Sequence, residues 1–292
     1  MQFRNLSKRT VGFAIVGTLF LFCAGVWVAV LAETPRGVLT VAVLNIGQGD
    51  SIYIESPTGL RVLLDGGPDS SVLRELSKVM PLFSHSVDAV IESHPDSDHI
   101  AGLVDVLARY HVGAFIEPGI IKHNATTDAL EGELTSEKVS RYIARRGMTI
   151  DLGGGAQLDI LYPNSDVSRI PEAKDNEGVI VARLVYGNTS VMLTADSPKD
   201  VEQKLIALDG AGLQSTLLKV CHHGSKSCSG SAFIAAVHPS VALISVGANN
   251  KYGHPNQETL DTFALQNIPV LRTDKDSTIV FRSDGEKFVR VQ

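Results

Sequence analysis

The chain has 292 residues, of which 44% are hydrophobic and 20% charged, and its formal net charge at pH 7 is -6. This balance argues against a broad basic surface for duplex nucleic acid, which normally requires clustered Lys and Arg. It leaves open a phosphate-containing substrate that is held chiefly by metal ions. After the first three dozen residues, about 255 remain, which is enough for one large α/β domain with a substantial core.

An uncharged stretch of 22 residues, Val11 to Ala32, lies near the amino terminus. At about 1.5 Å per residue, a helix of this length crosses a bilayer core of roughly 30 Å. Three basic residues precede it, Arg4, Lys8 and Arg9. By the positive-inside rule the residues that follow the stretch face away from the cytoplasm. We therefore predict a transmembrane anchor over about residues 11–32.

A cleaved signal peptide is the alternative, because Val30-Leu-Ala32 before Glu33 has the small-x-small pattern of a cleavage site. The apolar core of a signal peptide spans roughly 7–15 residues, however, so the length favours a retained anchor. Both interpretations place the rest of the chain outside the cytoplasm. The predicted division is residues 1–36, a cytoplasmic stub with the anchor and a linker, and residues 37–292, a single catalytic domain.

Short β-type runs separated by Gly and Pro turns open this domain, and strands then alternate with helices. The predicted strands in this first half are Val38–Leu44, Ser51–Glu55, Arg61–Leu64, Val87–Ile91 and Ala114–Glu117. The predicted helices are Val72–Met80, about His99 to Arg109, and Ser136–Arg145 at the end of a charged region.

The second half repeats the alternation after a turn at Gly153-Gly-Gly155. Its predicted strands are Gln157–Leu161, Val179–Tyr186, Ser190–Leu193, Ser215–Val220 and Val241–Val246; its predicted helices are Lys199–Leu208 and Ser231–Val237, with a last helix and short strands after them. Two halves, each with a sheet and covering helices, predict two sheets packed face to face with helices outside. The expected class is therefore α/β (α+β), a four-layer αββα sandwich.

The segment His94-Pro-Asp-Ser-Asp-His99 holds four potential metal ligands, His94, Asp96, Asp98 and His99. It follows the predicted strand Val87–Ile91, so the ligands lie on a strand-to-helix loop that can direct them at one point. Mixed nitrogen and oxygen ligands suit Zn²⁺, Mn²⁺ or Fe²⁺ better than Mg²⁺ or Ca²⁺. Asp98 alone could instead cap the next helix. That alternative leaves the other three residues unexplained.

Two carboxylates follow other predicted strands. Asp65, in Leu-Leu-Asp-Gly-Gly67, either forms a turn or supports the ligand shell. Asp196 either bridges two metal ions or caps the helix that begins near Pro198. A bridging carboxylate reduces the repulsion between two dications, and ions about 3.5–4 Å apart can hold the attacking and leaving oxygens of a phosphoryl or acyl centre.

The doublet His222-His223 follows another strand. Neighbours in an extended segment point in opposite directions, so we expect one to bind metal and the other to meet substrate or support the shell. Ser225 and Lys226 come next and either contact a phosphate oxygen or lie in a solvated loop. His254 is a weaker candidate.

Cys221 and Cys228 flank this doublet, and the third cysteine, Cys23, lies in the apolar stretch. The pair could form a disulfide in an oxidising compartment or remain as two thiols, and Cys221 could also approach a metal ion. The spacing decides none of these.

Six ordered blocks resemble the metallo-β-lactamase-fold superfamily and, more narrowly, the carboxy-terminal domain of the ComEC family of DNA-uptake channel proteins. The blocks are Asn45–Asp50, Leu63–Gly67, Ser93–Gly102, Leu193–Asp196, Leu218–Lys226 and Gly247–Pro255. The resemblance extends from about Val38 to the end of the chain. It implies an αββα sandwich with two divalent metal ions at its edge and phosphodiesterase or nuclease activity.

Carried over position by position, the resemblance implies that His94 and Asp96 bind one metal ion, that Asp98, His99 and one of His222 or His223 bind the other, and that Asp196 bridges. We take His222 as the ligand, and assign catalysis to Asp98, His223 and Lys226. The residues that would support the metal ligands or contact the substrate are Asp65, Asn176, Ser225 and His254.

The chain departs from the general superfamily pattern in two places. Asp96 replaces the second histidine of HxHxDH, as in the ComEC-like branch, and oxygen in place of nitrogen makes Mn²⁺ plausible beside Zn²⁺. The later histidine of the superfamily has no counterpart, and Asn176 lies in the corresponding stretch. One apolar segment also cannot form a pore, so DNA uptake would require a separate membrane channel protein as partner.

The leading functional hypothesis is thus a membrane-anchored, extracytoplasmic phosphodiesterase acting on DNA or another phosphodiester. A lactone, amide or thioester hydrolase would use the same site. The third hypothesis belongs to a different functional class: the chain would be a metal-poor, non-catalytic subunit of a DNA-uptake apparatus.

Overall fold

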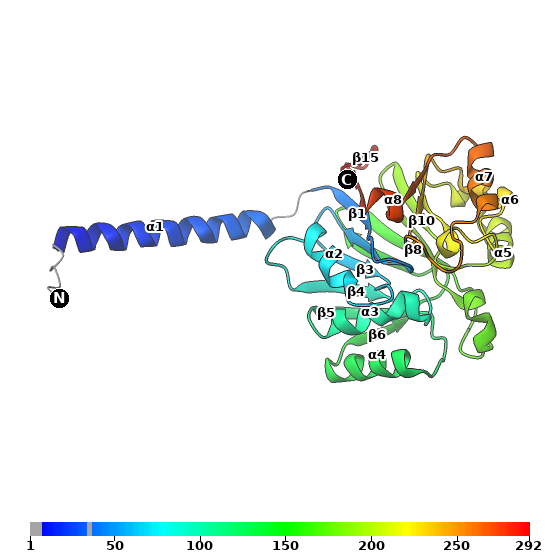
Figure 1. Cartoon of the computed structure of the whole chain (residues 1–292), viewed down its shortest axis with the longest axis horizontal. Helices are drawn as coiled ribbons and strands as arrows, with labels where there is room; N and C mark the ends of the chain where they lie inside the picture. Colours follow the sequence, from blue (N-terminus) through cyan, green and yellow to red (C-terminus); the bar gives the residue numbers. More distant parts are fainter. Residues whose placement is uncertain (1–7, 34–36) are drawn as a thin grey trace. The chain divides into compact units, whose positions relative to one another are not determined.

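The computed structural model describes residues 8–33 and 37–292 (Figure 1). Helix α1 (Lys8–Glu33) contains a segment, Lys8–Val28, that is long and apolar enough to cross a membrane by length and composition. Its large apolar side chains, among them Phe13 and Trp27, are exposed. The predicted anchor is therefore one continuous helix. Most of the predicted stub and linker lie outside the described residues, and the division at residue 36 stays a prediction.

The first sheet of the domain has eight strands in the order β15-β14-β1-β2-β3-β4-β5-β6. They are β1 (Leu39–Val43), β2 (Ile52–Glu55), β3 (Arg61–Leu64), β4 (Ser86–Ile91), β5 (His111–Glu117), β6 (Ser140–Ile143), β14 (Ile279–Ser283) and β15 (Phe288–Arg290). Strands β3 to β6 are parallel, and the remaining pairs are antiparallel. Helices α2 (Ser71–Val79), α3 (Ser97–Leu107) and α4 (Ala125–Ser136) lie beside the parallel half (Figure 1).

The second sheet has seven strands in the order β13-β12-β11-β10-β9-β8-β7. They are β7 (Thr149–Gly153), β8 (Ala156–Tyr162), β9 (Val181–Tyr186), β10 (Thr189–Leu193), β11 (Leu217–Lys219), β12 (Val241–Ile244) and β13 (Val270–Arg272). Strands β10 to β13 are parallel. The remaining helical elements are α5 (Lys199–Asp209), α6 (Ser231–Val237), α7 (Gln257–Leu265), α8 (Thr273–Asp276) and the short 3₁₀ turns Glu172–Gly178, Gly210–Leu213 and Cys221–Gly224.

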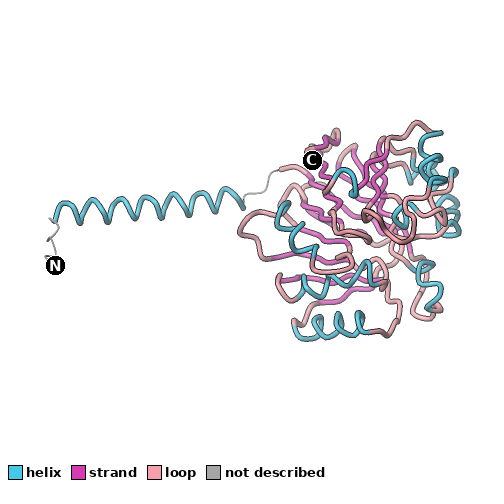
Figure 2. The backbone as a smooth tube through the Cα atoms, viewed as in Figure 1, coloured by secondary structure: helices cyan, strands magenta, loops and turns pink. Residues whose placement is uncertain are grey.

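Alternation along the strands sorts the apolar side chains into layers. Val41 of β1 and Leu158 of β8 belong to one core that both sheets share. Met192 of β10 faces the other way, into a second core with Val201 of α5 and Phe233 of α6. The ribbon trace shows the strands at the centre of the domain and the helices outside (Figure 2). The predicted αββα sandwich is confirmed.

One predicted helix is wrong. A helix was predicted at residues 136–145, but the helix in this region is α4, which ends at Ser136. Strand β6 follows it. Asn124 begins α4 with a capping box, in which its side chain accepts from the backbone N–H groups of Thr126 and Thr127. Tyr142 and Ile143 then continue the first sheet beside β5, at its edge, where aromatic and β-branched residues are favoured.

The carboxyl ends of parallel strands meet at one edge of each sheet, and this positions the candidate site. In the first sheet, Leu64 of β3 lies opposite Ile91 of β4, so Asp65 emerges beside the loop Glu92–Asp96, which leads into the first turn of α3 with Asp98 and His99. In the second sheet, Leu193 of β10 lies opposite Lys219 of β11, which aligns the segments that carry Asp196 and His222-His223.

Candidate metal centre

The loop after β4 brings its ligands to the start of α3. His94 and His99 are both fully buried, although imidazole is polar. Asp96, rather than Asp98, is the N-cap residue of α3, and its side chain makes no capping hydrogen bond. The carboxylates of Asp96 and Asp98 are therefore free to face the site, and the interpretation of Asp98 as a cap does not hold.

Asp65 both forms the turn and supports the ligand shell. It has a φ of 60°, and its carboxylate accepts from the Ser93 backbone N–H at 2.7 Å and from His99 Nδ1 at 2.8 Å. The turn fits closely against α3, because a Cβ on Gly66 would lie 2.5 Å from the nitrogen of Leu103. Because His99 donates through Nδ1, its Nε2 is left as an acceptor for a metal ion.

Asp196 does not cap α5, whose N-cap position is Pro198. Its Oδ1 lies 3.5 Å from His99 Nε2, and its Oδ2 lies 3.4 Å from His222 Nε2 and 3.9 Å from His223 Nε2. The two oxygens thus face imidazoles from different sides of the site. This is the placement that a bridging carboxylate requires.

His222 and His223 both face the site, contrary to the expectation that only one would. The expectation assumed an extended segment, but both residues have positive φ, 47° and 54°, within a 3₁₀ turn. His223 is buried, and its Nε2 lies 3.3 Å from Asp98 Oδ2. Its Nδ1 donates to the Ser245 carbonyl at 3.1 Å. His222 is about one-third exposed, with 32% of its side chain accessible. His223 thus has the more buried and better oriented ligand position.

The donor atoms fit divalent metal ions. Two ligands at about 2.1 Å from one tetrahedral ion are roughly 3.4 Å apart. The separations here are 3.5 Å for His94 Nε2 and Asp96 Oδ2, and 3.3 Å for His223 Nε2 and Asp98 Oδ2. Buried ligand atoms, His94 Nε2, His99 Nε2, His223 Nε2 and Asp196 Oδ1, also have no hydrogen-bond partner in the described chain. Such orphaned polar atoms are costly unless a ligand satisfies them.

The carboxylates and imidazoles also perturb one another. Burial disfavours charge on His99, but the carboxylates of Asp196 and Asp65 outweigh it and raise the pKa of His99 well above its ordinary value. The imidazoles in turn hold the pKa of Asp196 well below its usual range, against the effect of burial. The pKa of His223 is raised to about 9, because Asp196 and Asp50 outweigh its burial. Without metal, protons take the place of cations at this site.

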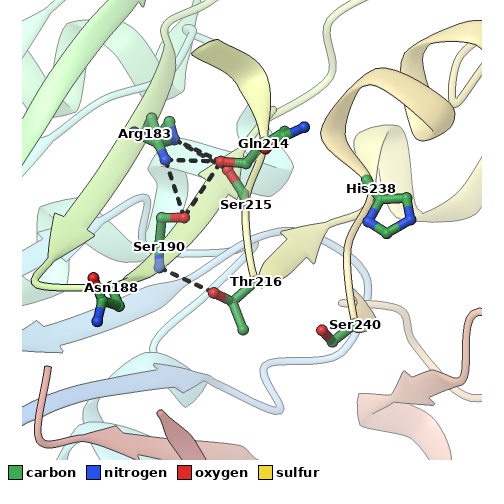
Figure 3. Close-up of a pocket in the computed structure, with 8 residues that line it drawn as sticks. All are labelled: Arg183, Asn188, Ser190, Gln214, Ser215, Thr216, His238 and Ser240. Atoms are coloured by element: carbon green, nitrogen blue, oxygen red, sulfur yellow. Dashed lines mark hydrogen bonds between the residues drawn. The ribbon is translucent and has the colours of Figure 1, made fainter. Parts of the chain in front are cut away.

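A cavity of about 180 Å³ opens on this cluster, and its walls are Gln48, Asp96, Asp98, Asp196, His222, His223, Tyr252 and His254. The ring of His254 lies 5.7 Å from that of His222 and stacks on Tyr252. The sequence indicated His254 but not Gln48 or Tyr252. A larger hollow of about 340 Å³ lies at the opposite, amino ends of β10 to β12, around Arg183 (Figure 3). No carboxylate lines it, so it is not the metal site.

Six predicted residues do not line the cavity: Asp65, His94 and His99 belong to the buried cluster itself, and the other three are Ser225, Lys226 and Asn176. Ser225 is buried and accepts from Ser227, and Lys226 is exposed. Asn176 is half-buried in the 3₁₀ turn Glu172–Gly178. Their roles in substrate contact or proton transfer stay predictions without geometric support.

Several contributing residues were not predicted. Lys122 Nζ donates to Asp96 Oδ1 and to Asp175 Oδ2, both at 2.7 Å, beside the position of the missing superfamily histidine. Lys219 and Asp50 form a fully buried ion pair at 2.6 Å, and Asp50 Oδ1 lies 3.2 Å from His223 Nδ1. Asp50 closes the first of the six sequence blocks, and Lys219 lies in the fifth. Both residues therefore lie in sequence blocks that resemble the family, and this was the signal that could have indicated them.

Cys221 and Cys228 form a disulfide that closes the loop carrying His222 and His223. A loop of this size constrains the unfolded chain by about 2–3 kcal/mol in the chain-entropy model. The double variant Cys221→Ser/Cys228→Ser should lose that much free energy of unfolding, as measured by urea denaturation without reductant. Reductant should bring the unaltered chain to the same value and leave the variant unchanged. Equal stability of the two oxidised proteins would contradict the structural role.

Glu202 of α5 supports the same loop, accepting from the backbone N–H groups of Ser229 and Gly230. Burial raises its pKa from 4.5 to about 6 despite these hydrogen bonds. The folded chain therefore holds this proton more tightly than the unfolded chain, and the stabilisation, about 2 kcal/mol, is lost as pH rises from about 4.5 to about 6. The difference in unfolding free energy between the unaltered chain and Glu202→Gln should change by this amount across that interval. A pH-independent difference would contradict it.

The family model of the metallo-β-lactamase superfamily matches residues 44–248, and the chain belongs to this superfamily of metal-dependent hydrolases. Two solved structures share the fold. YhfI from Bacillus subtilis has a TM-score of 0.56 and 16% identity, and the match covers 84% of this chain and 100% of that chain. Igni18 from Ignicoccus hospitalis has a TM-score of 0.55 and 15% identity, and the match covers 83% of this chain and 98% of that chain.

Among curated proteins the chain is similar to competence proteins. It is 33% identical over 264 residues to ComE operon protein 3 of Bacillus subtilis (strain 168), which covers 83% of this chain and 33% of that protein. It is 28% identical over 251 residues to competence protein ComA of Neisseria gonorrhoeae, covering 85% and 33%. The chain thus spans about a third of the length of these relatives. The ComEC-like resemblance is confirmed at the level of sequence.

Proposed function

We propose that the chain is a metal-dependent phosphodiesterase that acts on DNA or a related phosphodiester. The observation that carries the proposal is Asp196, whose two carboxylate oxygens face imidazoles on different sides of one buried cluster. Two divalent ions held there, Zn²⁺ or Mn²⁺, would activate water and stabilise charge on a phosphoryl group. Similarity to competence proteins supports DNA as the substrate.

The residues divide as follows. His94 Nε2 and Asp96 Oδ2 form one side of the cluster, and Asp98 Oδ2 and His223 Nε2 form the other, with His99 and Asp196 between them. Asp65 fixes the proton of His99 on Nδ1, and the Ser245 carbonyl fixes that of His223 on Nδ1. His254 lines the cavity beside His222, where its imidazole can protonate a departing alkoxide.

We further propose that α1 anchors the domain and that the domain acts outside the cytoplasm. The disulfide next to the histidine doublet supports this side, because disulfides persist in oxidising compartments. Secretion after cleavage is the competing arrangement. In DNA uptake, a separate membrane channel would be the partner.

The test compares substrates on one preparation of the full chain in detergent, loaded with Mn²⁺ or Zn²⁺. Bis(p-nitrophenyl) phosphate should be hydrolysed, and a lactone and a β-lactam should be hydrolysed far more slowly. Faster hydrolysis of the lactone or the β-lactam than of the phosphodiester would indicate that the chain is an acyl hydrolase instead. Turnover of none of them by metal-loaded protein would favour the non-catalytic subunit.

A further inference from the structure

A second pocket, of about 480 Å³, lies behind the metal-binding loop. We call it the Glu92 pocket. It is formed by the carboxyl ends of β4 and β5, the loop that follows β5, helix α4 and strand β6. Its volume is in the range of small-molecule sites, and its walls include the side chains of Ile120, Leu130 and Ile143.

The pocket is next to the metal centre, because both share the same wall. Pro95 lines the pocket and lies between the candidate ligands His94 and Asp96. Lys122 also lines it, while its Nζ donates to Asp96 Oδ1 at 2.7 Å. Asp96 lines the cavity of the metal centre. A substrate with its phosphate at the metals could therefore extend a neighbouring group into the Glu92 pocket.

Glu92 is a buried polar group in the wall of this pocket. It is only 6% exposed, and its carboxyl makes no hydrogen bond within residues 8–33 and 37–292. The nearby cations are committed elsewhere: Arg141 is paired with Glu117 and Glu131, and Lys122 with Asp96 and Asp175. A buried carboxyl without a partner lowers stability, so a ligand that donates to it is the missing partner.

The chemistry of the walls selects the kind of ligand. Lys122 and Arg141 in the walls are already paired with carboxylates, and Asp128 adds a negative charge, so the pocket suits an uncharged part of the substrate. The apolar side chains suit the faces of a flat ring, and a carboxyl oxygen of Glu92 can accept from an N–H at the edge of that ring. Every nucleobase carries at least one N–H on its pairing edge, and carboxylates accept hydrogen bonds from such groups.

We propose that the Glu92 pocket binds a nucleobase of the substrate, with Glu92 accepting a hydrogen bond from the base edge while the adjacent phosphate lies at the metal centre. The inference rests on the proposed phosphodiesterase function and narrows its substrate to nucleotides. The same contact predicts little preference for one base over another, because all four offer an N–H.

Binding is measured first, without metal or turnover. The metal-free full chain in detergent is titrated calorimetrically with adenosine, cytidine, guanosine and thymidine. The unaltered protein should bind them, and Glu92→Leu should bind about tenfold more weakly. Glu92→Gln keeps a carbonyl acceptor and should bind much as the unaltered protein does. Ile143→Ser, at a half-exposed position of the wall, should also weaken binding and serves if Glu92→Leu is unstable.

Kinetics then separate the two claims. With the metal-loaded chain, Glu92→Leu should raise KM for the p-nitrophenyl phosphate ester of thymidine about tenfold and leave methyl p-nitrophenyl phosphate, which has no base and no second ring, unchanged. Failure of all four nucleosides to bind the unaltered protein would overturn the Glu92 pocket, whatever the activity. Nucleoside binding without hydrolysis of either ester would leave the pocket standing and remove the proposed function.

Discussion

Asp196→Ala should release bound metal and lower kcat/KM for a phosphodiester by at least about a thousandfold. The reason is that Asp196 belongs to two groups of candidate ligands: Asp196 shares one group with His94 and His99 and the other with His223. Loss of a bridging ligand removes several kcal/mol of transition-state stabilisation, and each 1.36 kcal/mol is about tenfold in rate. Elemental analysis and steady-state kinetics on the same preparation measure both effects.

Asp261→Ala is the matched control, because Asp261 is an exposed carboxylate of α7 that accepts from Gln257 on the same helix. It should retain the metal content and turnover of the unaltered chain. If Asp196→Ala kept its metal and its activity, Asp196 would not bridge, and the dinuclear arrangement would be wrong.

Lys219→Met should lower the free energy of unfolding by about 3–5 kcal/mol, since it leaves a buried carboxylate without its cation. Lys219 Nζ lies 2.6 Å from Asp50 Oδ2, and both side chains are fully buried. The double variant Asp50→Asn/Lys219→Met removes both charges and should recover much of this loss. Denaturant unfolding of the single and double variants measures the difference. Full stability of Lys219→Met would contradict the buried pair.

Asp50→Asn has a distinct readout, because Asp50 Oδ1 lies 3.2 Å from His223 Nδ1. A carboxylate behind a ligating imidazole increases its basicity, and its loss typically costs about 10–100-fold in metal affinity. The double variant should therefore regain stability but not metal affinity. Unchanged affinity in Asp50→Asn would mean that Asp50 has only a structural role.

Much of the fold was predictable, because its strands carry strong local signals. Apolar, β-branched runs such as those of β4 and β12 (Val241–Ile244) are strands, and the Gly153-Gly-Gly155 turn joins β7 to β8. The helix predicted at residues 136–145 was wrong because the charged composition of this region does not by itself indicate a helix. The capping box at Asn124 marked the true start, and pairing with β5 decided the strand, which is a long-range interaction that a local pattern does not contain.

At the site, the ligand types were predictable and their orientations were not. Strand ends indicated Asp65, Asp196 and the histidine doublet, but the positive φ of His222 and His223 belongs to a tight turn, and the local pattern indicated an extended segment instead. Lys122 and Lys219 were missed for a related reason. A lysine is normally a surface residue, and only the folded chain shows that each neutralises buried carboxylates.

The most direct test of the central claim is the metal content of the full chain, measured beside its phosphodiesterase activity before and after chelation. The reconstituted chain should hold close to two divalent ions, Zn²⁺ or Mn²⁺, and its activity should disappear on chelation and recover when metal is returned. A reconstituted chain that binds no transition metal, or whose hydrolysis of phosphodiesters is unaffected by chelation, would contradict the central claim.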